Sequence, residues 1–118
     1  MKCGDAIQAV KIADLLIRDG NLPLILLDLQ LVPLREVRRV LASTWHRFQR
    51  LVEPTGIAFV VLTNQPVIEG ASVRIALRQR WTLAAMRERR RALLGRLSAQ
   101  VFPRRHFPSA LERERQSA

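Results

Sequence analysis

Two apolar segments of this chain end in side chains that can bind metal or nucleotide. Asp28 directly follows the apolar run Leu24–Leu27, and Asn64 and Gln65 follow the apolar run at 57–62. Uninterrupted apolar runs are typical of parallel strands covered on both faces. Parallel strands bring their carboxyl ends to one edge, where an Asp can orient Mg²⁺ through water, as in a Walker B segment. The alternative interpretation is that all three are turn residues.

The sequence lacks the phosphate-binding part of such a site. It contains no GxxxxGK[ST] motif, and its five glycines are widely scattered. No Ser/His/Asp or HExxH arrangement is present, and Cys3, His46 and His106 lie too far apart in the sequence to predict a metal cluster. We therefore expect a non-enzyme without a resident cofactor, with His46 at the surface. ATP and Mg²⁺ are expected only if another chain supplies the phosphate loop.

The chain is strongly basic and favours polyanionic partners. Its 20 Lys and Arg residues against 10 Asp and Glu residues give a net charge of +10, which favours nucleic acid or an acidic protein. A solubilising surface is the alternative. Only 5% of the residues are aromatic, so base stacking is not expected to dominate DNA binding. The candidate DNA- or partner-binding residues are Arg74, Arg78, Arg80, Arg87, Arg89, Arg90, Arg91, Arg104 and Arg105.

Composition and local pattern also predict compartment and domain organisation. One cysteine excludes an internal disulfide and fits a reducing compartment. Neither a secretory pattern nor a run of about 18 apolar residues is present, so we expect a cytoplasmic protein without a membrane partner. The 118 residues suit one domain over 1–103, followed by a polar basic tail at 104–118.

Hydrophobic periodicity predicts an α/β fold in the order α-β-α-β-β-α-β, with helices packed on a mainly parallel sheet. Helices are expected near 5–18, 34–53 and 83–95, and strands at 22–27, 57–62, 73–81 and 97–101. Asp5 is expected to cap the first helix and Gly20 to close it. Side chains predicted to face inward are Ile7, Val10, Ala13 and Ile17; Leu34, Val37, Leu41, Trp45, Phe48 and Val52; Val73, Ile75, Leu77 and Trp81; and Leu83, Met86, Leu93 and Leu94.

The order of these segments resembles the carboxyl-terminal half of a RecA-type ATPase core. The likeness runs from Ala6 to Arg80: a helix ending in RDG at 18–20, the strand ending at Asp28, the strand ending in Asn64 and Gln65, and the basic strand at 71–78. The RDGNLPLILLDL run at 18–29 and the STWHR run at 43–47 resemble the ImuA and SulA-like branch, which supports damage-induced mutagenesis.

The resemblance implies roles for these residues. Asp28 would correspond to the magnesium-positioning acid, and Gln65 to the glutamine that senses nucleotide. The family's phosphate loop is missing, and the DNA-binding loop would be only about residues 66–72, so no autonomous ATPase is implied. The expected partners are RecA or an error-prone DNA polymerase, with DNA as a further candidate and homo-oligomers through an open sheet edge.

Three functions remain open at this stage. The first is an accessory protein of DNA repair and translesion mutagenesis in the SOS response. The second is a nucleotide-binding subunit that completes an ATP site with another chain. The third is a generic protein-interaction domain whose arginines keep it soluble.

Overall fold

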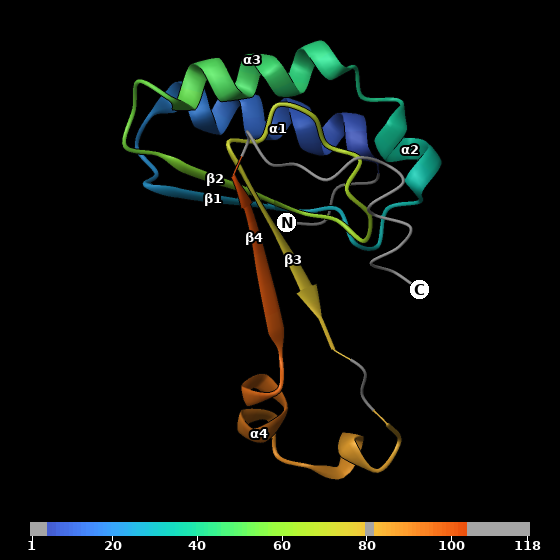
Figure 1. The fold of residues 1–118 in the computed structure, drawn as a ribbon. Helices are drawn as coiled ribbons and strands as arrows, with labels where there is room; N and C mark the ends of the chain where they lie inside the picture. Colours follow the sequence, from blue (N-terminus) through green and yellow to red (C-terminus); the bar gives the residue numbers. More distant parts are fainter. Residues whose placement is uncertain (1–4, 80–81, 104–118) are drawn as a thin grey trace. The chain divides into compact units, whose positions relative to one another are not determined.

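The protein has a mixed α/β fold made of two compact units. The computed structural model describes residues 5–79 and 82–103 (Figure 1). The units comprise residues 1–71 and 72–118, and the single domain expected over 1–103 stays a prediction. The elements are α1 (Ala6–Asp19), β1 (Leu24–Asp28), α2 (Leu34–Arg38), α3 (Ala42–Val52), β2 (Ala58–Leu62), β3 (Val73–Arg78), the 3₁₀ helix η1 (Ala85–Arg87), α4 (Arg90–Gly95) and β4 (Ser98–Pro103).

Both ends of α1 form as the sequence predicts. Asp5 Oδ1 accepts a hydrogen bond from the backbone N–H of Gln8 at 2.6 Å, which satisfies one of the free donors at the helix start. Gly20 closes the helix with φ 74° and ψ 4°, and its N–H bonds to the carbonyl of Leu16. A glycine adopts this left-handed conformation without a steric penalty.

The first unit contains a parallel pair of strands. β1 and β2 align from Leu24 opposite Ala58 to Asp28 opposite Leu62, which confirms that the two apolar runs are neighbours. Helices α1 and α3 lie on one side of this pair (Figure 1). On that side Phe48 is almost fully buried and meets the rings of Trp45 and Phe59 edge-on, with centroids 5.9 and 5.3 Å away.

The opposite face of the parallel pair is apolar and exposed. Leu24 and Leu26 are 59% and 58% exposed, and Val60 is 40% exposed. The sequence predicts strands covered on both faces, and this prediction is wrong for the described residues. An apolar run records only that a segment is hydrophobic, whereas coverage depends on elements packed from elsewhere in the chain or from a partner.

The long helix predicted over 34–53 is two helices. Backbone bonds from Arg39 N–H to the Glu36 carbonyl and from Val40 N–H to the Val37 carbonyl tighten the end of α2, and Leu41 is then extended at φ −64° and ψ 142°. Leu41 consequently leaves the predicted buried stripe and is 69% exposed. The hydrophobic period does not distinguish one helix from two helices that use the same stripe on either side of a turn.

Strands β3 and β4 form an antiparallel pair, which corrects the prediction of one mainly parallel sheet. Val73 of β3 lies opposite Pro103 of β4, and Arg78 lies opposite Ser98. The predicted inward-facing side chains Val73, Ile75 and Leu77 are 53–60% exposed. Alternation predicted the strand correctly but did not specify its neighbour.

The predicted helix over 83–95 is interrupted. η1 ends at Arg87, residues Glu88 and Arg89 are extended, and α4 begins at Arg90. Like charges three and four positions apart destabilise a helix, and Arg87, Arg90 and Arg91 stand at that spacing. Of the inward-facing side chains predicted here, Leu83, Met86 and Leu94 are exposed, with Leu83 at 90%.

We expect Gly70→Ala to destabilise the first unit by about 1–3 kcal/mol, because residue 70 has φ 78° and an added Cβ would lie 2.9 Å from His46 Nδ1. Gly20→Ala should lower the free energy of unfolding by about 1 kcal/mol, since φ at residue 20 is also positive but an added Cβ would meet nothing within 4 Å. Gly56→Ala, with neither feature, is the control. Urea unfolding midpoints rank the stability of the three variants. Equal midpoints for Gly70→Ala and Gly56→Ala would contradict the close approach of Gly70 to His46.

Candidate functional site

The carboxyl ends of β1 and β2 form a shared edge. The register places Asp28 opposite Leu62, and the pairing extends one step further through a 2.9 Å hydrogen bond from Leu29 N–H to the Leu62 carbonyl. Leu29 is buried at 2% exposure, so it anchors the start of the loop after β1. The loop that carries Asn64 leaves the sheet at the same edge.

The peptide groups around Gln30 join the predicted acid and amide. Asp28 Oδ1 accepts a 3.0 Å hydrogen bond from the Gln30 N–H, and Asn64 Nδ2 donates a 2.6 Å hydrogen bond to the Gln30 carbonyl. Asp28 and Asn64 therefore meet at one rim of the sheet. Both also act as turn residues, because each side chain forms a hydrogen bond to the backbone of the loop after β1.

Gln65 lies in the same loop, and its backbone holds a tight turn. The Gln65 carbonyl accepts hydrogen bonds from Thr63 Oγ1 and from the Val67 N–H, both at 2.8 Å. The residue is exposed. Its backbone contacts fix the loop and leave its side chain at the surface of this rim.

The three predicted side chains at this rim, Asp28, Asn64 and Gln65, are exposed, and two of them bond to the loop backbone. Among residues 5–79 and 82–103, no group of three His, Cys, Asp or Glu side chains could hold a metal ion.

The predicted basic residues that the structure describes all lie in the second unit. Arg74 and Arg78 share one face of β3, with Arg74 half-buried and Arg78 exposed. Four further exposed arginines surround the junction of η1 and α4: Arg87, Arg89, Arg90 and Arg91. α4 lies beyond the end of the hairpin where β3 stops and β4 begins (Figure 1), so the arginines extend along the unit. Arg80, Arg104 and Arg105 lie outside the described residues.

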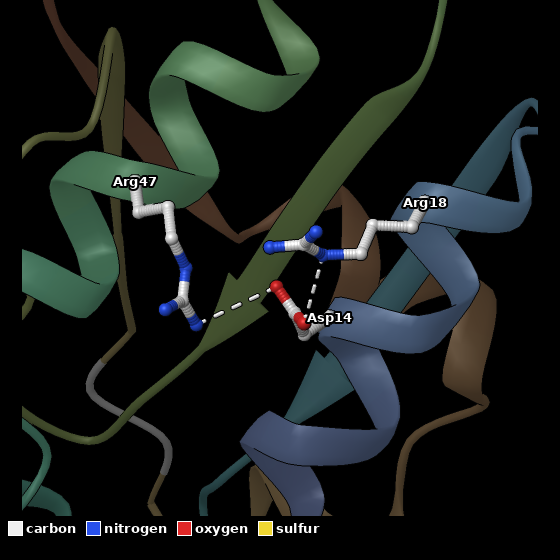
Figure 2. Close-up of polar contacts among 3 residues, drawn as sticks. All are labelled: Asp14, Arg18 and Arg47. Atoms are coloured by element: carbon white, nitrogen blue, oxygen red, sulfur yellow. Dashed lines mark hydrogen bonds and ion pairs between the residues drawn. The ribbon is translucent and has the colours of Figure 1, made fainter.

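A half-buried acid on α1, Asp14, was not among the candidates that the sequence indicated. Figure 2 shows Asp14 between Arg18 of its own helix and Arg47 of α3. Arg18 Nε donates to Asp14 Oδ2 at 3.0 Å, and an Arg47 terminal nitrogen lies 3.5 Å from Oδ1. That second contact is an ion pair without a hydrogen bond, and Oδ1 is a buried oxygen with no hydrogen-bond partner. The four-residue spacing of Asp14 and Arg18 was the sequence signal for half of this cluster.

The Asp14 cluster borders a groove of about 540 Å³ on the helical side of the first unit. Its walls come from residues 7–15 of α1 and from residues 39–47, which span the α2–α3 turn and the start of α3. The lining is mostly apolar. His46 lies nearby on α3 but points elsewhere: its Nε2 is 3.8 Å from Glu69 Oε2, and its side chain is 44% exposed, in agreement with the predicted surface position.

No protein-family model, curated protein or solved structure matches this chain. Among residues 5–79 and 82–103, no helix combines the length and apolar character needed to cross a bilayer.

We expect Asn64→Ala to lower the free energy of unfolding by about 1 kcal/mol, because it removes the 2.6 Å hydrogen bond that ties the two rim loops together. Gln65→Ala alters the neighbouring exposed side chain and serves as the control. Urea denaturation followed by circular dichroism provides the measurement. A stability loss from Gln65→Ala equal to that from Asn64→Ala would contradict the assigned hydrogen bond.

Proposed function

We propose that this chain is a RecA-like accessory protein of DNA repair and translesion mutagenesis, of the ImuA type, which binds a protein partner and has no ATPase activity of its own. The observation that carries the proposal is the parallel β1–β2 pair, which brings Asp28 and Asn64 to one rim. This is the arrangement that the resemblance implies for the second half of a RecA-type core.

The exposed face of the parallel pair supports binding to a protein. Leu24, Leu26 and Val60 lie on one face with Ala58 and leave it apolar. Parallel strands are normally covered on both faces, and contiguous exposed apolar surface marks interaction sites. A protein partner that covers this face would supply what the described part of the unit lacks.

The expected partner is RecA or an error-prone DNA polymerase. We expect one of them to bind the purified chain, and Leu26→Lys to weaken that binding at least tenfold by placing a charge in the apolar contact. Leu31→Lys is the matched control, because Leu31 is 99% exposed in the turn after β1. Calorimetric titration measures both, and absence of binding to either protein would reject the proposed partners.

DNA contact is a second candidate, favoured by the exposed arginines at 87 and 89–91. If they contact phosphates, affinity for single-stranded DNA should fall steeply with salt. The double variant Arg90→Glu, Arg91→Glu should reduce the slope of log K against log salt by about 1.4, or 0.7 for each lost contact. The double variant Arg35→Glu, Arg38→Glu makes the same charge change in the first unit and is the control. No binding at low salt, or an equal loss in both variants, would exclude this interface.

A nucleotide-binding subunit is a further alternative beside the generic interaction domain, and the exposed Asp28 carboxylate is the observation that favours it. It requires a second chain with a phosphate loop. In that case Asp28→Asn, which keeps an acceptor for the Gln30 N–H, should abolish ATPase activity reconstituted with the partner. Unchanged activity would reject this alternative and leave Asp28 with its turn-forming role.

A further inference from the structure

The groove between α1 and α3 is a second exposed apolar surface of the first unit, on its helical side. Ile7 and Leu15 on α1 are 44% and 67% exposed, and Leu41 on the opposite wall is 69% exposed. Val10, which also lines the groove, is buried. Three large exposed apolar side chains around one hollow are more than the scattered exposure of an ordinary surface.

The spacing of the lining residues matches a helical ligand. Ile7, Lys11 and Leu15 follow one another at intervals of four residues, so they form a row along one side of α1. Such a row packs against the corresponding row of another helix laid along it. An amphipathic helix that binds in an apolar groove uses anchors with this same periodicity.

The charges around the groove specify the sign of the ligand. Lys11, Arg39 and Arg47 line it, and the one acid among the lining residues, Asp14, is already paired with Arg18 and Arg47. Arg39 has only a 3.7 Å contact with Glu36 of its own helix, which is a weak exposed pair. The margin of the groove therefore carries a positive charge that carboxylates on a ligand would complement.

The exposed apolar side chains of the groove favour a protein ligand over a nucleic acid. Phosphates would contact the basic side chains of the groove but would leave Ile7, Leu15 and Leu41 without an apolar partner. An acidic amphipathic helix satisfies both features, because leucines on one face fill the groove and carboxylates on its flanks meet Lys11, Arg39 and Arg47.

We propose that the α1–α3 groove binds an acidic amphipathic helix of a partner protein. This surface lies on the opposite side of the β1–β2 pair from the exposed sheet face, so the inference does not depend on the partner proposed above.

A designed peptide provides the probe. A peptide of roughly 18 residues carries Leu at helical spacing on one face, Glu on the two flanks of that face and Ala elsewhere to favour the helix. One control peptide has the same composition scrambled to remove the apolar face, and a second has Lys in place of Glu. Fluorescence anisotropy with the full chain should detect the first peptide, with at least tenfold weaker binding of both controls.

Matched variants locate the binding surface. Lys11→Glu and Leu15→Ser should each weaken the acidic peptide roughly tenfold, whereas Arg50→Glu and Leu31→Ser, which make the same changes outside the groove, should leave it unchanged. All four residues are exposed, so circular dichroism should show intact folds. Leu26→Lys on the sheet face should also bind the peptide normally, which separates this surface from the proposed partner site.

Three results would overturn the inference. The first is equal binding of the scrambled peptide, the second is equal binding of the Lys peptide, and the third is unchanged affinity of Lys11→Glu and Leu15→Ser. A DNA oligonucleotide that displaces the peptide and is itself weakened by both variants would assign the groove to nucleic acid instead.

Discussion

The parallel pairing of β1 with β2 is the contact on which the first unit depends. It joins residues 24–28 to residues 58–62, and the intervening chain must return along the sheet through α2 and α3. Two strands alone bury too little surface to be stable. Their persistence requires the helical cover, in which Phe48 is 1% exposed and contacts Trp45 and Phe59.

The same pairing determines what is left at the surface. Once α1 and α3 cover one face of the strands, Leu24 and Leu26 must emerge on the other, because successive side chains of a strand alternate between faces. The loops after both strands must also leave at one rim, where the Gln30 peptide groups bond to Asp28 and Asn64. The apolar face and the polar rim are thus two consequences of one register.

The distribution of charge and apolar surface is typical of an interaction module. The net charge of +10 opposes self-association and favours acidic partners. In the first unit, apolar surface is exposed both on the sheet face and in the groove near Asp14, whose charge is balanced by Arg18 and Arg47. In the second unit, exposed arginines stand beside exposed apolar side chains such as Ile75 and Leu77. These features are the basis on which we propose binding as the function.

Local patterns predicted a substantial part of the candidate site. Asp28 and Asn64 were expected at one edge because each follows an apolar run, and the structure places them there. Only half of the Asp14 cluster was predictable from the sequence. Arg18 stands one helical turn from Asp14, whereas Arg47 reaches Asp14 from another helix. The groove could not be predicted, because its walls are separated by more than twenty residues and Leu41 enters it only through the break after α2.

By itself the sequence determined the order of most helical and extended segments and where some of them begin and end. Asp5 and Gly20 act within one turn of the backbone, so their effect does not depend on distant packing. Only the tertiary structure decided that β3 pairs with β4 in an antiparallel sense, that one face of β1 stays exposed, and that Arg47 meets Asp14. Those outcomes depend on which distant segments meet, and a hydrophobic pattern shows that a side chain prefers burial without specifying what buries it.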